Sequence, residues 1–227
     1  MPRPLLLGHR GARKYAPENT IAALQLALDH GCDGFEFDVR MTADMHAVVC
    51  HDPKFLRQII AQSRRSDLDV PALEEVLSLF AAKCFLNIEL KVGGTESCTA
   101  ELLRLHCPAR GGIVSSFLPA VIERLAERKP EVPLGIICES KKQLALWKDL
   151  PISTMMLNRK LVSESLVHEL HEAGKQVFVW TVNNAREMQK LAALQVDGII
   201  SDDTKLLATT LSRWPPALSE MPSRPIP

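Results

Sequence analysis

Charged side chains alternate with apolar ones at two places in the sequence. Glu36 and Asp38 flank a phenylalanine, and Glu89 and Lys91 flank a leucine. Residues two apart in a β-strand point to the same face, so each charged pair would share one face of a strand. Because the apolar face must pack on other elements, the charged face is expected to point into the fold.

Several carboxylates buried together are unfavourable unless something neutralises them. Mg2+ and Ca2+ prefer carboxylate and water oxygens as ligands, so Glu36, Asp38 and Glu89 are predicted to hold one divalent cation, with Lys91 beside it. The alternative is an ion-pair network of the same four side chains without a metal. The metal is favoured because perturbed carboxylates gather at functional sites more often than at structural ones.

His9 and His51 differ from the other five histidines because each ends an apolar run and is followed at once by a charged residue. Paired imidazoles near a metal suit general acid and general base roles around neutral pH. The spacing alone leaves this role and a structural one equally open. The remaining histidines are interpreted as structural or exposed: His30, His46, His106, His168 and His171.

Strands alternating with helices must position these groups. Apolar runs predict strands near 5–9, 34–40, 85–91, 112–117, 133–139, 154–158, 176–182 and 197–202. Helical periodicity predicts helices near 19–30, 72–82, 97–107, 119–129, 141–149, 163–173, 185–194 and 204–212. Eight strand–helix pairs indicate parallel strands joined by right-handed crossovers, closed into a (β/α)8 TIM barrel of the α/β class. An open doubly wound sheet is the alternative, but no Gly-x-Gly-x-x-Gly turn follows the first strand.

The barrel is predicted to be a single domain over residues 1–213. An extra short strand near 47–52 and a short insertion, residues 53–70, follow the second barrel strand. Residues 214–227 carry five prolines and no apolar period, so we expect a poorly ordered tail. In the barrel, catalytic groups would lie at the carboxyl ends of the strands.

Composition excludes some classes of partner. Lys plus Arg (27) balances Asp plus Glu (27), which argues against nucleic acid because phosphate backbones recruit basic surfaces. The chain has no apolar run long enough for a transmembrane segment, and no secretory signal is recognisable, so a cytoplasmic location is expected. The six cysteines lack a Cys-x-x-Cys pair and indicate free thiols rather than disulfides or a zinc site.

Eight motifs occur in order between residue 5 and about 207. They are His9-Arg10-Gly11, Pro17-Glu18-Asn19-Thr20, Glu36-x-Asp38, His51-Asp52, Glu89-x-Lys91, Ser115-Ser116-Phe117, Val179-Trp180-Thr181-Val182-Asn183 and Val196-Asp197-Gly198-Ile199-Ile200-Ser201-Asp202. A single His-Arg-Gly would be weak evidence, but the ordered set resembles the glycerophosphodiester phosphodiesterase family. That resemblance also implies a (β/α)8 barrel.

The resemblance implies roles for the charged residues. Glu36, Asp38 and Glu89 match the family's metal ligands, with Mg2+ expected and Ca2+ as the alternative. His9 and His51 match its acid and base pair, although which histidine is the acid stays open.

Three further residues match substrate-binding positions. Arg10 matches the residue that holds the substrate phosphate, a task suited to a bidentate guanidinium. Lys91 matches a second cation near that phosphate. Trp180 matches an aromatic side chain at the site mouth that packs on the glycerol moiety, with barrel packing an equal alternative.

The implied activity is metal-dependent hydrolysis of small glycerophosphodiesters to sn-glycerol 3-phosphate and an alcohol such as choline or ethanolamine. One alternative is a lysophospholipase D-like or sphingomyelinase D-like phosphodiesterase that acts on lipid head groups. Another is a Schiff-base lyase that uses Lys91, which the neighbouring carboxylates disfavour because they keep the lysine protonated. A ligand-binding barrel without activity is the third alternative.

The sequence departs from the family pattern in two places. Family members usually carry a longer insertion than residues 53–70, so the site is expected to be more open. Asp203 stands where the family tends to have a proline. Glu18 and Asn19 are interpreted as shaping and capping the first helix. Asp202 either orients a group of the site or caps the helix that follows it, and the cap is favoured.

Overall fold

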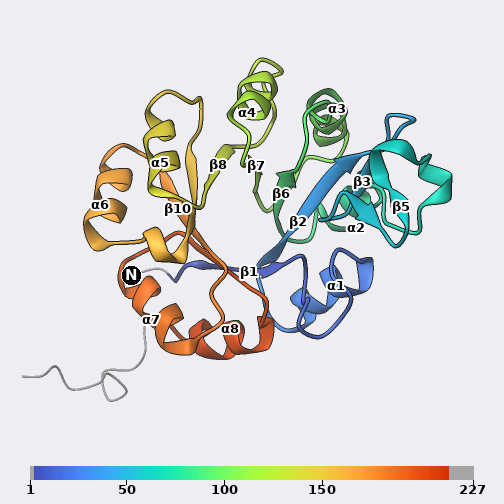
Figure 1. The fold of residues 1–227 in the computed structure, drawn as a ribbon. Coiled ribbons are helices and arrows are strands. Elements are labelled where there is room, and N and C mark those ends of the chain that lie inside the picture. Colours follow the sequence, from blue (N-terminus) through green and yellow to red (C-terminus); the bar gives the residue numbers. More distant parts are fainter. Residues whose placement is uncertain (1–2, 215–227) are drawn as a thin grey trace, which may run out of the picture.

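The computed structural model of this protein describes residues 3–214, in which strands and helices alternate along the chain (Figure 1). The predicted tail, residues 214–227, lies outside the described residues apart from Trp214. The barrel strands are β1 (Leu5–His9), β2 (Gly34–Met41), β6 (Phe85–Leu90), β7 (Gly112–Ser116), β8 (Leu134–Cys138), β9 (Thr154–Asn158), β10 (Gln176–Trp180) and β11 (Gly198–Ser201). The helices are α1 (Ile21–Asp29), α2 (Leu73–Phe80), α3 (Glu96–Leu105), α4 (Pro119–Ala126), α5 (Lys141–Leu144), α6 (Glu164–Glu172), α7 (Ala185–Ala193) and α8 (Thr204–Leu211).

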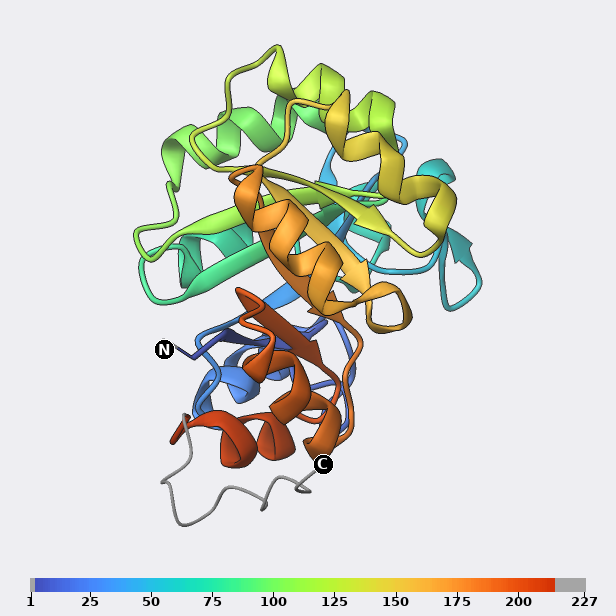
Figure 2. The same cartoon turned by 90° about the vertical axis from the view of Figure 1, so that its left-hand side faces the viewer.

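These eight strands form a closed parallel barrel. Each strand pairs in parallel with the next in the order β1, β2, β6, β7, β8, β9, β10, β11, and β11 pairs with β1 to complete the ring. The helices surround the strands, and a side view shows them on the outside of the barrel (Figures 1 and 2). The predicted (β/α)8 barrel is therefore confirmed.

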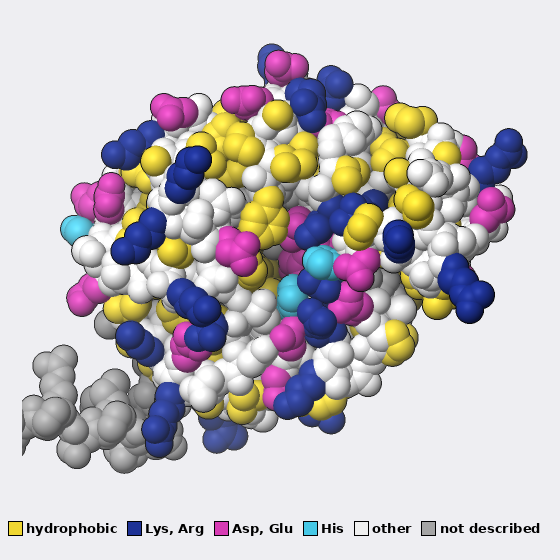
Figure 3. Space-filling view, viewed as in Figure 1, with side chains coloured by type: hydrophobic (Ala, Val, Ile, Leu, Met, Phe, Trp, Pro, Cys, Tyr) yellow, Lys and Arg dark blue, Asp and Glu magenta, His cyan; other side chains and the backbone are white. Residues whose placement is uncertain are grey.

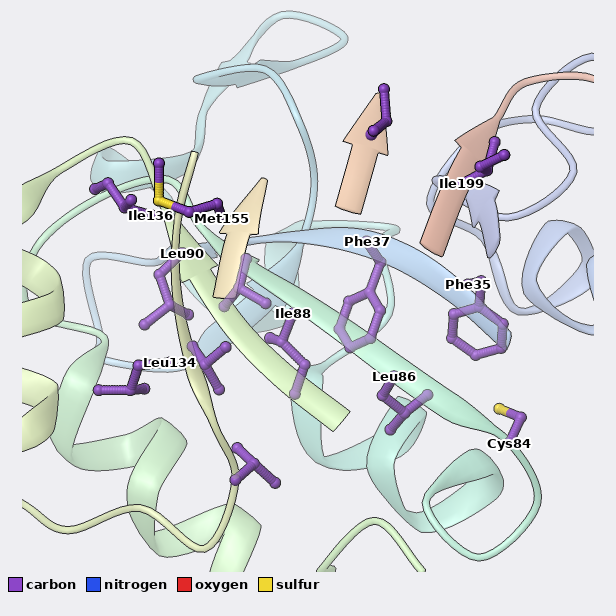
Figure 4. Packing of buried hydrophobic residues seen from close by; sticks show 14 of the residues in the cluster. Phe35, Phe37, Cys84, Leu86, Ile88, Leu90, Leu134, Ile136, Met155 and Ile199 are labelled. Atoms are coloured by element: carbon purple, nitrogen blue, oxygen red, sulfur yellow. The ribbon is translucent and has the colours of Figure 1, made fainter. Parts of the chain in front are cut away.

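The alternation in β2 produces the two faces of the barrel wall. Phe35, Phe37 and Val39 are fully buried in the apolar cluster outside the strands, and Figure 4 shows the Phe35 and Phe37 side chains within it. The Phe35 ring meets that of Phe80 on α2 edge to face at 5.1 Å. The neighbours of Phe35, Phe37 and Val39 in sequence point into the barrel. A second, smaller apolar cluster fills the interior of the barrel: Leu7, Ile113, Ile137, Met156, Phe178 and Ile200. The inner cluster closes the barrel below the charged groups, so no channel passes through it.

Helix ends agree with the sequence signals in most places. Thr20 caps α1 by accepting a hydrogen bond from the Ala23 N–H at 3.1 Å, and Gly31 follows the helix with a φ of +90°. The stretch 141–149, predicted as one helix, is instead the short α5 followed by a 3-10 segment, Ala145–Lys148. Its buried face is narrow, since none of its residues is fully buried, and packing therefore gives little support to a longer α-helix.

The insertion after β2 is a small structured lobe. It comprises β3 (Ala47–Val49), which pairs antiparallel with β2, the hairpin β4 (Lys54–Phe55) and β5 (Gln58–Ile59), and the 3-10 segments Ile60–Gln62 and Arg65–Asp67. Outside this lobe, one more 3-10 segment, Arg159–Leu161, follows β9. The lobe has its own apolar cluster, made of Val48, Cys50, Ile60, Leu68 and Val70, with Phe55 packed against it. The extra strand predicted near 47–52 is present over its first three residues.

Two findings bear on the composition arguments. No helix within residues 3–214 is long and apolar enough to cross a bilayer. All six cysteines are free, and burial raises the pKa of the Cys32, Cys84 and Cys138 thiols to about 12. Cys107, which follows α3, is exposed.

Candidate active site

The strand register brings the charged residues together at the carboxyl ends of the first barrel strands. His9 on β1 is paired with Glu36 on β2, and Asp38 on β2 is paired with Glu89 on β6. Side chains paired across parallel strands point to the same side of the sheet. The register therefore places these four side chains inside the barrel as one group.

Glu36, Asp38 and Glu89 form a compact, buried cluster of carboxylates. One oxygen of each lies within 4.8 Å of the other two. Burial, together with the charges of Asp38 and Glu89, holds the pKa of Glu36 well above its usual range. Burial and the charge of Asp38 raise the pKa of Glu89 to about 7. The cluster is thus unfavourable as three anions unless more positive charge is supplied.

Two cations reach part of this cluster. Lys91 Nζ lies 2.5 Å from Glu89 Oε1 and 3.4 Å from Asp38 Oδ1, and Arg10 Nε lies 3.3 Å from Asp38 Oδ2. Burial lowers the pKa of Lys91, but the neighbouring carboxylates outweigh it and the net shift is upward. Lys91 is therefore protonated at neutral pH.

Glu36 is the member of the cluster that these side chains leave incompletely satisfied. Its Oε2 accepts a hydrogen bond from the Arg10 N–H at 2.9 Å, while its Oε1 is buried without a hydrogen-bond partner among the described residues. A hard divalent cation bound by the three carboxylates would satisfy this oxygen. The donor set therefore fits such a cation better than a metal-free ion-pair network.

The turn after β1 directs the backbone N–H of Arg10 toward Glu36 of this cluster. Arg10 and Gly11 both have positive φ, +53° and +78°. A Cβ on Gly11 would lie 2.5 Å from the backbone of Ala23, so only glycine allows α1 to approach the turn this closely. The Arg10 side chain also donates to Glu18 Oε1 at 2.8 Å, so Glu18 orients the guanidinium.

His9 is held by a carboxylate from the opposite end of the chain. Its Nδ1 lies 2.6 Å from Asp202 Oδ1, and its Nε2 lies 3.9 Å from Glu36 Oε2. Asn183 donates to Asp202 Oδ2 at 2.6 Å. Burial raises the pKa of Asp202, but the hydrogen bond from His9 and the charge of that ring outweigh it, so the net shift is downward. An ionised Asp202 accepts the Nδ1 proton and directs Nε2 of His9 to the cavity.

The interpretation favoured for Asp202, a cap of the last helix, is wrong, whereas the alternative, that it orients a group of the site, agrees with its hydrogen bond to His9. Asp203 caps α8 by accepting from the Leu206 N–H at 3.1 Å. Asp203 also accepts hydrogen bonds from Lys14 and Tyr15, both at 2.5 Å. Because two adjacent aspartates can both serve as a cap, the sequence alone did not distinguish them.

His51 follows β3 and lies on the lobe rather than on the barrel. Its Nδ1 is 2.7 Å from Asp52 Oδ1, and the Arg40 Nε donates to its carbonyl oxygen at 2.8 Å. Burial is the largest cause of a lowered pKa for this imidazole. His51 is more exposed than His9, with 30% against 16% of the side chain accessible. It is therefore neutral at neutral pH and open to the cavity.

The sequence predicted that Asn19 shapes or caps the first helix, but Thr20 is the cap and Asn19 has a different role. It is buried, has a φ of +58°, donates from Nδ2 to Asp38 Oδ2 at 2.9 Å and accepts from the Asp38 N–H at 3.3 Å. Asn19 thus orients a carboxylate of the cluster. Because Asn19 directly precedes the cap Thr20, its position in the sequence suggested a local role, and helical periodicity could not predict a contact with Asp38.

The cavity at this end of the barrel has two unlike sides. His9, Arg10, Glu36, Glu89 and Lys91 line one side, which we call the polar wall. Phe117, Ile137, Met156, Trp180 and Ile200 line the other, which we call the apolar wall. Figure 3 shows the hollow at the centre of this face, with acidic side chains inside it and two histidines beside it.

Trp180 both packs against other residues of the barrel and lines the cavity, so the two environments predicted for it are combined. Its Nε1 donates to the Met156 carbonyl oxygen at 3.0 Å, and its ring meets Phe117 edge to face at 5.7 Å. The ring also lines the cavity. Two further residues line the same cavity: Phe117, which occurs in one of the sequence motifs but had no predicted role, and Glu139, which was not among the predicted site residues. An aromatic residue after a strand is common, and no spacing rule marks an exposed glutamate.

The fold and the placement of the polar groups define a (β/α)8-barrel enzyme whose site lies at the carboxyl ends of the strands. Comparison with known proteins gives the family. A model of the Glycerophosphoryl diester phosphodiesterase family matches residues 9–83 and 58–206, and the chain belongs to that family of enzymes. The resemblance found in the sequence motifs is therefore confirmed.

Individual relatives agree with this assignment. A glycerophosphodiester phosphodiesterase of Caldanaerobacter subterraneus subsp. tengcongensis is 30% identical over 90% of this chain and 96% of its own length. The crystal structure of a glycerophosphodiester phosphodiesterase from Agrobacterium tumefaciens matches with a TM-score of 0.82 and 25% identity, over 91% of this chain and 99% of that one. An Oleispira antarctica phosphodiesterase, solved in complex with the product sn-glycerol-3-phosphate, matches with a TM-score of 0.79 and 24% identity, over 92% and 96%.

Proposed function

We propose that this protein hydrolyses glycerophosphodiesters to sn-glycerol 3-phosphate and an alcohol, with a divalent cation and two histidines. The observation that carries the proposal is the buried cluster of Glu36, Asp38 and Glu89 between two cationic side chains and two imidazoles. The relatives named as glycerophosphodiester phosphodiesterases, and the product bound to the Oleispira protein, support the substrate class.

Glu36, Asp38 and Glu89 would hold the cation. The unpartnered Glu36 Oε1 and the raised pKa values of Glu36 and Glu89 are what a site lacking positive charge is expected to have. Mg2+ is proposed, with Ca2+ as the alternative, because the donors are carboxylates. The bound ion supplies a Lewis acid for a phosphate oxygen.

Arg10 and Lys91 would bind the phosphate and stabilise the charge that develops on its oxygens during displacement. Both line the polar wall, so they would hold the phosphate on the side of the cavity where the acid cluster lies. Lys91 is also 5.6 Å from the Phe117 ring centroid, which places it at the border with the apolar wall. The Trp180 ring would pack on the glycerol moiety.

His9 and His51 would exchange protons with the substrate through Nε2, because the Nδ1 atoms face Asp202 and Asp52. One imidazole takes a proton from the nucleophile, and the other gives a proton to the departing alcohol oxygen. With water as the nucleophile the product is sn-glycerol 3-phosphate directly, whereas attack by the neighbouring glycerol hydroxyl gives a cyclic phosphate that a water molecule must open in a second step. The lowered pKa of His51 favours a neutral ring, which accepts a proton. The hydrogen bond between His9 Nδ1 and Asp202 fixes the orientation of the other ring.

The rival functions are weaker. A Schiff-base lyase needs a neutral Lys91, and the carboxylates that raise the pKa of this lysine oppose that form. A phosphodiesterase acting on lipid head groups would use the same cluster and is distinguished by its substrate.

The test is turnover of glycerophosphocholine, glycerophosphoethanolamine and lysophosphatidylcholine with Mg2+, with Ca2+ and after exhaustive chelation. Choline, ethanolamine and sn-glycerol 3-phosphate are measured, and phosphorus NMR identifies any cyclic phosphate. We expect release of sn-glycerol 3-phosphate from the first two substrates and its loss on chelation. Full activity after chelation contradicts the metal, and turnover of lysophosphatidylcholine alone contradicts the substrate class.

A further inference from the structure

Glu139 carries the carboxylate that faces the polar wall across the cavity. It directly follows β8, which is the fifth strand of the ring counted from β1, so it lies across the barrel mouth from His9 and Arg10. Glu139 lines the cavity together with those two residues. The polar wall therefore combines Arg10 and Lys91 with the carboxylate cluster, and a further, separate carboxylate lies on the opposite rim.

The position of Glu139 is fixed while its carboxylate is left free. The backbone N–H groups of Glu139 and Ser140 both donate to Gln143 Oε1, each at 2.9 Å, as part of the capping box that begins α5. Among the described residues, no donor or cation contacts the Glu139 side chain. An anchored residue with an unengaged acceptor at a cavity rim is suited to bind a donor from a ligand.

The surroundings of this carboxylate limit what the donor can be. A phosphate anion is repelled by Glu139 and attracted by Arg10 and Lys91, so the phosphate is kept on the far side. The rings of Phe117 and Trp180 line the same cavity and offer an apolar surface suited to a short carbon chain. The ligand group that meets Glu139 is thus a neutral or cationic donor a few atoms away from the phosphate.

We propose that Glu139 is a specificity-determining residue that accepts a hydrogen bond from the primary hydroxyl of the glycerol moiety. This inference rests on the proposed function and names how the same site selects glycerol. The primary hydroxyl is the glycerol group farthest from the phosphate ester, and the secondary hydroxyl stays nearer the acid cluster. Phosphate and hydroxyl are then held at opposite rims, with the carbon chain against the apolar wall.

The test combines variants of Glu139 with a substrate that lacks the hydroxyl. Steady-state kinetics of the metal-loaded protein are measured on glycerophosphocholine and on 2-hydroxypropyl phosphocholine, which has no primary hydroxyl. Glu139→Ala is expected to lower kcat/KM on glycerophosphocholine about tenfold, mainly through KM. Glu139→Gln keeps an uncharged acceptor and is expected to lose less.

The decisive expectation is that the two changes are not additive. The unaltered protein loses about the same factor on 2-hydroxypropyl phosphocholine, and Glu139→Ala causes no further loss on that substrate. Glu131→Gln is the matched control, because Glu131 is an exposed glutamate just before β8, at the other end of the strand. This control is expected to behave like the unaltered protein on both substrates.

Three results overturn the inference. They are an unchanged kcat/KM of Glu139→Ala on glycerophosphocholine, an equal loss on both substrates, and a loss on glycerophosphocholine that is absent on glycerophosphoethanol. The last would assign Glu139 to a cationic alcohol instead of glycerol. If the unaltered protein cleaves no glycerophosphodiester, the proposed function itself fails, which is a separate outcome.

Discussion

The polar wall and the apolar wall of the cavity are built from the same kind of strand but obey opposite rules. On β2 and β6 the inward positions carry charge, against the general preference for apolar side chains inside a barrel. On β8, β9 and β11 the inward positions are Ile137, Met156 and Ile200, which also pack with the inner apolar cluster. Charged side chains at inward positions are unfavourable for packing, so the polar wall is explained by chemistry alone. Apolar side chains at inward positions can stabilise the barrel and contact a ligand at the same time.

If the polar wall carries the chemistry, replacing one of the proposed metal-binding carboxylates should lower kcat/KM more than any change in the apolar wall. Glu36→Gln keeps the shape of the side chain and removes one negative charge from the acid cluster. We expect a loss of kcat/KM on glycerophosphocholine on the order of 10,000-fold, because several kcal/mol of Lewis-acid stabilisation are lost. Calorimetric titration should show much weaker Mg2+ binding. Unchanged Mg2+ affinity would contradict the ligand assignment, and Glu187→Gln, an ion-paired surface site, is the control.

The histidines are the next test. His9→Ala and His51→Ala are each expected to lower kcat about 1,000-fold, within the range for loss of a general acid or base. Neither should weaken Mg2+ binding by a comparable factor, which separates them from the acid cluster. Near-normal turnover of either variant would show that the assignment of that imidazole is wrong. His168→Ala, an exposed histidine on α6, is the matched control.

The apolar wall should respond more weakly. Trp180→Ala removes a ring that contacts Phe117 and donates to Met156, and we expect about a tenfold increase in KM with a smaller change in kcat. Trp180→Phe keeps the aromatic surface and should recover most of the affinity. If Trp180→Ala instead abolished Mg2+ binding, the two walls would not be separable.

The smallest effect concerns stability without metal. The pKa of Glu89 is raised to about 7, above its unfolded value, so the stability this group contributes is full below about pH 4.5 and is lost as pH rises through about 7. The chelated protein should therefore unfold a few degrees lower at pH 8 than at pH 6. Mg2+ should raise the midpoint more at pH 8, because protons compete with the ion. Glu36, whose pKa is also raised, acts in the same direction, so Glu89→Gln should reduce this difference without abolishing it. An unchanged difference in Glu89→Gln would contradict the role of Glu89.

The same contrast explains how much the sequence revealed. Glu36, Asp38 and Glu89 could be predicted to lie together because charge at inward positions contradicts the apolar pattern around it. Phe117 could not be singled out as a cavity residue, since an aromatic side chain there also satisfies packing. The barrel itself followed from counting eight strand–helix pairs.

Contacts between distant segments were beyond the sequence. The partner of His9 is Asp202, which directly follows β11, the strand that closes the ring, and Asn19 meets Asp38 from a position with positive φ. For both residues a local capping role was also consistent with the sequence, although Thr20 and Asp203 are the residues that cap the helices. The short α5 was mistaken for a longer helix because its periodicity is not matched by burial.

The lobe that carries His51 has a consequence for how such a site can change. The lobe has its own apolar cluster and pairs with β2, so it is held independently of the barrel interior. Its length can therefore vary while Glu36, Asp38 and Glu89 stay in place. His51, one of the two residues proposed to transfer protons, thus lies on a segment whose length can change, whereas His9, the other, lies at the end of a barrel strand. Divergence in the alcohols released would then be expected to arise first through residues 53–70, before any strand of the ring is altered.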